Sequence, residues 1–263
     1  MSDDSYTMRR ARFDRIAHQY DTYRPGYPSE VVDSILATTH VLPNARILEI
    51  GSGSGKATVL FARRGYSMLC IEPSRELTRI ATQKLTGLTN VEFVTATFED
   101  WEEEQTEFDL VVSAQSFHWI PPEIGYAKAA RVLKKQGYLA LFWNMYPDSE
   151  ENVLQELKRV FQEYAPSLNR ANYSEELVSQ SAMQIADSGH FSNVETRRFS
   201  WSARYSTEQY LGLLQTYGVY ARLTAERRKS LFAGVAEAID KHGGYLDKPY
   251  ITALYVAQKR STT

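Results

Sequence analysis

The chain has 263 residues, a formal net charge of −2 and 43% hydrophobic residues, so it can bury the core of an α/β domain. The weak net charge argues against a nucleic-acid partner, and no apolar stretch reaches the roughly 20 residues that span a bilayer. Cys70 is the only cysteine, so we expect a buried, inert thiol in a cytoplasmic protein. The five histidines lack metal-ligand spacing, and we therefore expect no metal site.

The N-terminal part of the chain is predicted to form helices. We expect residues 1–8 to be loosely held and a helix to run from Phe13 until the segment 24–28 breaks it. Ser29 is a candidate N-cap for a second helix. The tyrosines of this region either pack it onto the domain or line a ligand pocket, and the residues alone leave both readings open.

A glycine turn organises the rest of the chain. Residues 47–50 read as a buried strand, and Gly51, Gly53 and Gly55 follow it before a helical pattern begins. This order is typical of the first half of a nucleotide-binding βαβ unit, in which the ligand lies against bare backbone. The Gly-x-Gly-x-Gly spacing differs from the dinucleotide fingerprint. Glu49, at the carboxyl end of the strand, suits a ligand ammonium better than a pyrophosphate.

A second acid follows the next predicted strand, over residues 68–71. Glu72 lies 21 positions after Gly51, where nucleotide-binding folds place the acid that hydrogen-bonds a ribose diol. A surface glutamate at a strand end is the alternative reading. Ser74 is predicted to cap the following helix.

Three more strands are predicted over residues 91–94, 108–113 and 138–143, with a helix that begins at Pro122 and ends at 134–137. Gln115, His118 and Trp119 follow the strand over 108–113. The carboxyl ends of strands in open α/β sheets face the ligand crevice, so these side chains are candidates for ligand contact. For His118, a structural role and a proton-transfer role both remain open.

Past residue 144 the pattern changes. Helices are predicted over 153–164 and near 177–189, the second marked by Leu177, Met183, Ile185 and Ala186. A strand over 191–205, an extended helical stretch after Ser206 and a last strand over 251–257 complete the chain.

The run from Glu49 to Gly55 resembles the first motif of class I S-adenosylmethionine-dependent methyltransferases. Residues 13–28 resemble the N-terminal signature of the trans-aconitate methyltransferase-like group, and residues 113–119 and 131–139 resemble later motifs. The resemblance covers most of the first 145 residues. It implies an α/β fold: a Rossmann-like, seven-stranded, mostly parallel sheet with the last strand antiparallel and helices on both faces.

The resemblance also implies one methyltransferase domain over residues 1–263. Residues 1–40 would form a helical lid, 41–146 the cofactor-binding core, and 147–205 with 247–263 the rest of the sheet. Residues 206–246 would form a helical insertion over the active site.

By the same resemblance, the chain would bind S-adenosyl-L-methionine and release S-adenosyl-L-homocysteine. The family usually has an Asp that contacts the adenine, and Thr97 replaces it here. The expected cofactor-binding residues are Tyr20, Arg24, Glu49, Gly51, Ser52, Gly53, Gly55, Glu72, Pro73, Thr97, Phe98 and Gln115.

The methyl acceptor is not identified by the sequence. We expect a small molecule, for which a carboxylic acid is one candidate because Arg24, Arg204 and Arg222 lie near the tyrosine-rich segments. His118 is the candidate catalytic residue. Candidate acceptor-binding residues are Tyr27, Trp119, Trp143, Tyr217 and Tyr220.

Two other functions stay open at this point. One is a non-catalytic protein that binds S-adenosylmethionine or S-adenosylhomocysteine, and the other is an NAD-dependent oxidoreductase, which the glycine spacing disfavours. Nothing in the sequence decides between a monomer and a homodimer.

Overall fold

The computed structural model describes residues 3–102, 107–166 and 173–261 and contains one seven-stranded sheet, in the order β3-β2-β1-β4-β5-β7-β6. Strands β1 to β5 pair in parallel, whereas β7 runs antiparallel to both of its neighbours. This confirms the predicted Rossmann-like sheet. The strands are β1 Arg46–Ile50, β2 Ser67–Ile71, β3 Val91–Val94, β4 Phe108–Ala114, β5 Leu133–Met145, β6 Phe191–Ser206 and β7 Tyr245–Lys259.

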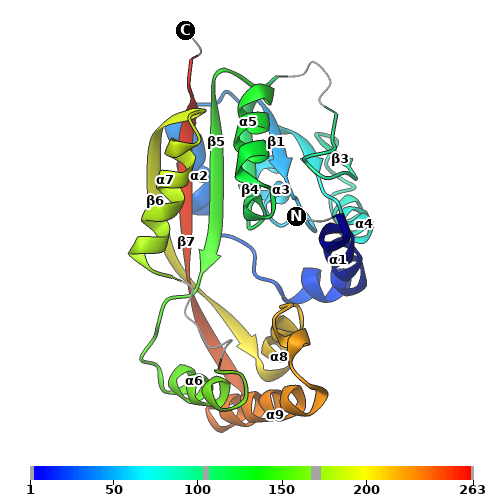
Figure 1. Ribbon diagram of the computed structural model, residues 1–263, viewed down its shortest axis with the longest axis vertical. Coiled ribbons are helices and arrows are strands. Elements are labelled where there is room, and N and C mark those ends of the chain that lie inside the picture. The colour runs from blue at the N-terminus through cyan, green and yellow to red at the C-terminus, as the bar shows by residue number, and fades with distance from the viewer. Residues whose placement is uncertain (1–2, 103–106, 167–172, 262–263) are drawn as a thin grey trace.

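Helices cover both faces of the sheet (Figure 1). Successive strand residues point to opposite faces of the sheet. Ile47 lies in the core that includes α2 (Ser29–Thr39) and α3 (Thr58–Ala62). Leu48 lies in the core on the other face, with α5 (Pro122–Val132) and α7 (Glu175–Asp187). α1 (Asp3–Tyr23) and α4 (Arg75–Lys84) pack on each other beside β3 (Figure 1). Within the described ranges, no helix is both long and apolar enough to cross a bilayer.

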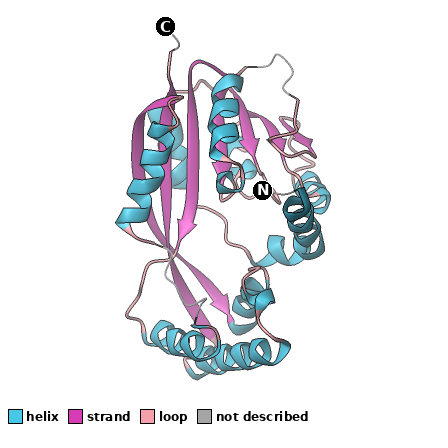
Figure 2. Cartoon of the chain, viewed as in Figure 1, coloured by secondary structure: helices cyan, strands magenta, loops and turns pink. Residues whose placement is uncertain are grey.

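β6 and β7 continue beyond the end of β5 as a two-stranded arm, which we call the strand extension (201–206 of β6 and 245–250 of β7). Three helices pack at its end: α6 (Asn152–Tyr164), α8 (Thr207–Gln215) and α9 (Ala225–Lys241) (Figure 2). They share a separate hydrophobic core with the strand extension. The chain therefore has a sheet part and a smaller helical part joined by two long strands.

Three predicted helix ends were wrong. α1 already begins at Asp3, and residues 1–2 lie outside the described part. Ser29 is the first residue of α2, preceded by Pro28, and its side chain makes no capping bond. α5 ends at Val132 and the chain passes directly into β5, because Leu133 pairs with Phe108 and is fully buried in the sheet core.

α7 forms close to the helix predicted near 177–189. Val178 and Ile185 are buried in the core on that face of the sheet, whereas Leu177 and Met183 are exposed.

The predicted continuous helical stretch after Ser206 is interrupted. α8 ends at Gln215 and α9 starts at Ala225, with a 3₁₀ turn, η3 (Tyr220–Arg222), between them. Arg12 of α1 fills the space beside Gly218, where an added Cβ would lie 1.5 Å from its Nη1 atom. Arg12 also donates to the Thr216 carbonyl at 3.2 Å. The segment between α8 and α9 is therefore fixed to α1.

Truncation of Leu213 tests this second core. Leu213 is fully buried among the strand extension, α6 and α9. Leu213→Ala should lower the free energy of unfolding by about 2–5 kcal/mol, because it removes buried methyl groups and leaves a cavity. Chemical denaturation measures this loss. Leu42→Ala, at an exposed leucine, is the matched control and should change stability by no more than about 0.5 kcal/mol. Equal effects of the two variants would contradict the packing described.

Candidate active site

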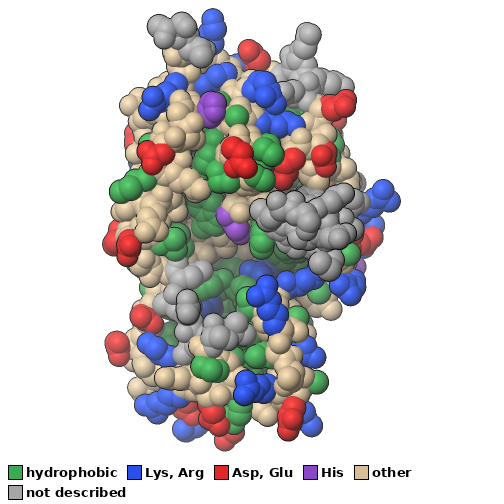
Figure 3. Space-filling view, viewed as in Figure 1, with side chains coloured by type: hydrophobic (Ala, Val, Ile, Leu, Met, Phe, Trp, Pro, Cys, Tyr) green, Lys and Arg blue, Asp and Glu red, His purple; other side chains and the backbone are tan. Residues whose placement is uncertain are grey.

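A cavity of about 1290 Å³ lies at the carboxyl ends of the parallel strands. The space-filling view shows a hollow with hydrophobic side chains along it, between the sheet part and the helical part (Figure 3). Loops after β1, β2, β4 and β5 reach the cavity because parallel strands end at one edge of the sheet. Helices α1, α6, α7 and α8 supply the other sides.

The Glu72 carboxylate connects the turn after β1 with the start of α4. One of its oxygens accepts from the Gly53 N–H at 2.8 Å, and the other accepts from the Ser74 N–H at 2.8 Å. Ser74 in turn caps α4, as predicted, by accepting from the Leu77 N–H. Burial raises the pKa of Glu72 to about 7 although both N–H groups favour the ionised form. Each carboxylate oxygen has a second lone pair, so the group can still accept from a ligand hydroxyl.

Glu49 is buried at the end of β1. Its Oε2 accepts from the Thr58 hydroxyl at 2.6 Å and lies 3.7 Å from the Cys70 sulfur. Its Oε1 is buried and has no hydrogen-bond partner among the described residues. Burial raises the pKa of Glu49 to about 7. An unsatisfied buried acceptor costs about 1–3 kcal/mol, so a ligand that donates a hydrogen bond here would relieve that cost.

The three glycines of the turn occupy different surroundings. Gly51 and Gly53 border the cavity, and Gly53, with φ of +57°, lies under the Tyr20 ring: an added Cβ would be 3.7 Å from a Tyr20 ring carbon. Gly55 packs against α4, where an added Cβ would be 3.1 Å from Leu85, and it does not border the cavity. Gly53 therefore leaves backbone open beside the cavity, whereas Gly51 allows Ser116 to approach, since an added Cβ would lie 2.4 Å from the Ser116 Oγ atom, and Gly55 allows close packing.

The loop after β3 presents Phe98 to the cavity but not Thr97. Phe98 is buried and stacks on Trp101. The Thr97 hydroxyl donates to the Asp100 carboxylate and accepts from the Asp100 N–H, both at 2.9 Å. The Thr97 side chain therefore closes a local turn and lies outside the cavity wall.

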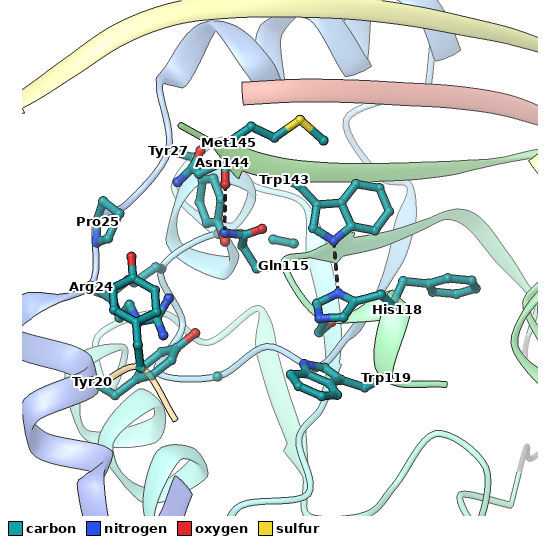
Figure 4. Close-up of a pocket in the computed structure, with 18 of the residues that line it drawn as sticks. Tyr20, Arg24, Pro25, Tyr27, Gln115, His118, Trp119, Trp143, Asn144 and Met145 are labelled. Carbon is teal, nitrogen blue, oxygen red and sulfur yellow. Dashed lines mark hydrogen bonds between the residues drawn. The ribbon is translucent and has the colours of Figure 1, made fainter. Parts of the chain in front are cut away.

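His118 and Trp143 interact across the ends of β4 and β5 (Figure 4). The Trp143 indole N–H donates to His118 Nδ1 at 3.2 Å. Since Nδ1 accepts this bond, the neutral imidazole carries its proton on Nε2 and can donate from there. Desolvation lowers the pKa of His118, which favours the neutral ring. Gln115 lies nearby with φ of +61° and donates to the Asn144 carbonyl at 3.3 Å.

α1 contributes Tyr20, and the segment just after it contributes Arg24, on the side of the cavity opposite His118 (Figure 4). Arg24 donates from Nε to the Thr216 hydroxyl at 2.8 Å, and its Cζ atom lies 3.8 Å from the ring centre of Tyr217. Across the described part of the chain, no carboxylate pairs with this guanidinium. Arg24 thus joins the segment after α1 to the segment after α8. Its positive charge lies beside the cavity without a carboxylate partner.

The sequence analysis missed Tyr146 and Lys248. The hydroxyls of Tyr146 and Tyr217 lie 2.5 Å apart, and the Lys248 ammonium lies 4.1 Å from the ring centre of Tyr146 and 5.4 Å from that of Tyr250. Leu246, Lys248 and Tyr250 alternate along β7, so the period of two could have placed Lys248 on the inner face. The last strand was predicted to start only at residue 251, which hid this signal.

Tyr217 and Tyr220 were expected on one helical stretch, but Tyr217 lies in the turn after α8 and Tyr220 in η3. Their rings still meet edge to face, with centres 6.2 Å apart. Arg204 and Arg222, once considered for an anionic acceptor, lie outside the cavity wall. The predicted residues that do border the cavity are Tyr20, Arg24, Tyr27, Glu49, Gly51, Ser52, Gly53, Glu72, Pro73, Phe98, Gln115, His118, Trp119, Trp143, Tyr217 and Tyr220.

Fold and site together form an α/β protein with a glycine turn between two strand-end acids. Residues 47–137 match the family described as a methyltransferase domain. This match and the relatives below support a class I S-adenosylmethionine-dependent methyltransferase. The narrower resemblance to the trans-aconitate group stays a prediction.

Known proteins similar to this chain carry the same class name. An uncharacterized methyltransferase of Schizosaccharomyces pombe is 24% identical over 246 residues, which is 91% of this chain and 94% of the relative. An uncharacterized methyltransferase of Mycobacterium tuberculosis is 30% identical over 125 residues, so the chain spans about half of that relative (49%) and 48% of itself.

Solved structures share the fold. A putative type II methyltransferase from Anaeromyxobacter dehalogenans has a TM-score of 0.64 at 21% identity, covering 90% of this chain and 97% of the other. Phosphoethanolamine N-methyltransferase 2 of Haemonchus contortus, solved with S-adenosyl-L-methionine, has a TM-score of 0.54 at 14% identity, covering 94% and 57%.

The buried Glu49 carboxyl should make stability depend on pH. Its folded-state pKa of about 7 lies above its ordinary value of 4.5, so the folded protein binds the proton more tightly than the unfolded chain. The stability from this group is fully present below pH 4.5 and is lost as the pH rises to about 7. Glu49→Gln, which keeps a neutral acceptor for Thr58, should gain stability relative to wild type between pH 5 and pH 8, by on the order of 2 kcal/mol.

Urea denaturation at the two pH values measures this gain. Glu92→Gln, at an exposed glutamate of β3, is the control and should show no such change. A pH-independent difference between Glu49→Gln and wild type would mean that the Glu49 carboxyl is ionised throughout.

Proposed function

We propose that the protein transfers a methyl group from S-adenosyl-L-methionine to a small-molecule acceptor, with a carboxylic acid as the acceptor class. The observation that carries the proposal is the placement of Glu49 and Glu72 at the ends of adjacent parallel strands, with the Gly51–Gly53 turn beside them. Two acids there favour a cofactor that presents an ammonium and a ribose diol, and disfavour a pyrophosphate.

The residues of this end of the cavity fit such a cofactor. The partnerless Oε1 of Glu49 suits an ammonium donor, and the free lone pairs of Glu72 suit two hydroxyls. Phe98 offers an apolar ring surface for adenine. Tyr20 and Arg24 close the same end from the lid, where the guanidinium suits the cofactor carboxylate.

When bound, S-adenosylmethionine supplies a methyl group on a positively charged sulfur, and its transfer to a carboxylate oxygen breaks the carbon–sulfur bond without releasing a proton. The protein then needs to orient the acceptor and exclude water, and no base is required. His118 suits that role, because its Nδ1 lone pair is engaged by Trp143 and its Nε2–H is free to donate to an acceptor oxygen.

Loss of the Glu72 carboxylate should weaken cofactor binding. Glu72→Ala should reduce the affinity for S-adenosylmethionine and S-adenosylhomocysteine by on the order of 1–3 kcal/mol, the range for hydrogen bonds to a charged group. Isothermal titration measures the affinity, and thermal melting without ligand checks that the variant is folded, since two backbone N–H groups also lose their acceptor.

Glu92→Ala is the control for this measurement and should bind like wild type. Unchanged affinity in a folded Glu72→Ala variant would remove the diol assignment. Tighter binding of NAD than of S-adenosylmethionine by the wild-type protein would overturn the proposed function.

The role of His118 can be decided from pH profiles. With a carboxylate acceptor, His118→Ala should reduce turnover by less than the 10²–10⁴-fold typical of losing a general base, because only a hydrogen-bond donor is lost. His118→Asn, which can keep a donor, should recover part of the rate. A loss above about a hundredfold, with disappearance of a pKa on the acid side of the profile, would identify His118 as a base and argue against a carboxylate acceptor.

A further inference from the structure

The cavity extends past the cofactor end to a region lined mainly by apolar and aromatic side chains. We call this region the acceptor chamber; it lies between the strand extension, α6 and α8. Its wall carries Lys248, on the inner face of β7, besides the paired Lys158 and Asp148. The apolar and aromatic residues that line it are Tyr146, Leu154, Leu157, Phe161, Tyr210, Leu213, Leu214 and Tyr220.

Lys248 has no acidic partner. Among the described residues, its ammonium contacts only the faces of Tyr146 and Tyr250. The other two lysines of the cavity wall are paired, Lys56 with Asp21 and Lys158 with Asp148. Lys248 therefore differs from both in keeping an uncompensated charge beside the cavity.

The aromatic faces do not compensate the ammonium fully. A cation over a tyrosine ring gains about 0.5–2 kcal/mol, whereas removing an ammonium from water costs several kcal/mol. Desolvation accordingly lowers the pKa of Lys248 to about 8. An anion placed against Nζ would restore the missing partner, and the adjacent Tyr146 and Tyr217 hydroxyls lie 2.5 Å apart at the same place.

The surroundings of Lys248 restrict what the rest of such a ligand can be. Leu157 and Phe161 of α6 and Leu213 and Leu214 of α8 present hydrocarbon to the chamber. A molecule with several carboxylates would bring further charges against these walls, where burying an unpaired charge is costly. An acid with one anionic group and an apolar body matches both features.

We propose that Lys248 binds the anionic group of an acceptor acid whose alkyl or aromatic body lies in the acceptor chamber. This deepens the proposed function and rests on it. It makes Lys248 a specificity-determining residue that selects monocarboxylic acids with an apolar body over short polycarboxylates. Arg24, the other cation without a carboxylate partner, lies between the two ends: its guanidinium contacts the Tyr20 ring on one side and Tyr217 and Thr216 on the other.

Binding of defined acids tests the proposal. Decanoate, 3-phenylpropionate and citrate would be titrated into the protein saturated with S-adenosylhomocysteine, and decanamide would serve as the uncharged match for decanoate. We expect decanoate or 3-phenylpropionate to bind at least tenfold more tightly than citrate and decanamide. Citrate as the best ligand, or equal binding of decanoate and decanamide, would overturn the proposal.

Variants at residue 248 connect that preference to the lysine. Lys248→Met should weaken binding of the preferred acid tenfold or more, Lys248→Arg should retain most of it, and both should bind S-adenosylhomocysteine within about twofold of wild type. Replacing a poorly compensated ammonium by methionine is not expected to unfold the protein. Lys135→Met, at an exposed lysine near the start of β5, is the matched control.

The outcomes separate the two proposals. Unchanged acid binding in Lys248→Met, or a loss of S-adenosylhomocysteine affinity in it, would refute the acceptor subsite while leaving the proposed function intact. Failure of the wild-type protein to bind S-adenosylhomocysteine at all would refute the proposed function. If the protein binds no S-adenosylhomocysteine but its binding of acids still depends on Lys248, Lys248 binds an anion without being part of a methyltransferase acceptor site.

Discussion

The two hydrogen bonds accepted by the Glu72 carboxylate hold the cofactor end of the cavity in shape. They tie the glycine turn after β1 to the first turn of α4, two segments that belong to adjacent parallel strands. α4 in turn supports the lid, because the Asp14 carboxylate of α1 accepts from the Ser74 hydroxyl at 2.6 Å. Turn, helix and lid therefore depend on one buried acid, whose neutral and ionised forms are close in free energy near neutral pH.

Burial raises the pKa of both Glu49 and Glu72 to about 7. The two carboxylates differ in how many of their oxygens already accept a hydrogen bond. Glu72 has both oxygens engaged by backbone N–H groups, whereas Glu49 keeps one oxygen without a donor. Glu72 is thus already part of the scaffold, whereas Glu49 has the less satisfied carboxylate. A cationic ligand would draw more stabilisation from Glu49 than from Glu72, even though both carboxylates line the cavity.

The sequence predicted the sheet well where local patterns carry the information. Residues 47–50, 68–71 and 91–94 are short apolar strands bounded by turn residues, and the structure places strands there. The glycine turn and both acids were likewise found from spacing. The Thr97 side chain does not reach the cavity wall because Asp100 takes its hydroxyl, a local competition that the sequence pattern does not show. The end of α5 was missed because tertiary burial of Leu133, not helix pattern, determines it.

The far half of the cavity could not be predicted in the same way. Lys248, Tyr146 and Tyr217 come together because β6 and β7 pair beyond the end of β5, and α8 follows β6 directly. Such contacts join residues about 30–100 positions apart, and no periodicity within one segment reports them. Nor does any pattern in the sequence place Arg12 in the space beside Gly218.

The burial of Cys70 makes this chain convenient for site-directed labelling. It is the only cysteine, it lies inside the sheet beside Glu49, and burial raises the pKa of its thiol well above the ordinary value. Thiol reagents should therefore leave the native protein unlabelled. A cysteine introduced on α1 and another on α9 would be the two reactive thiols of the folded chain. The distance between fluorophores attached there would report whether the lid and the helical part move together when ligands enter.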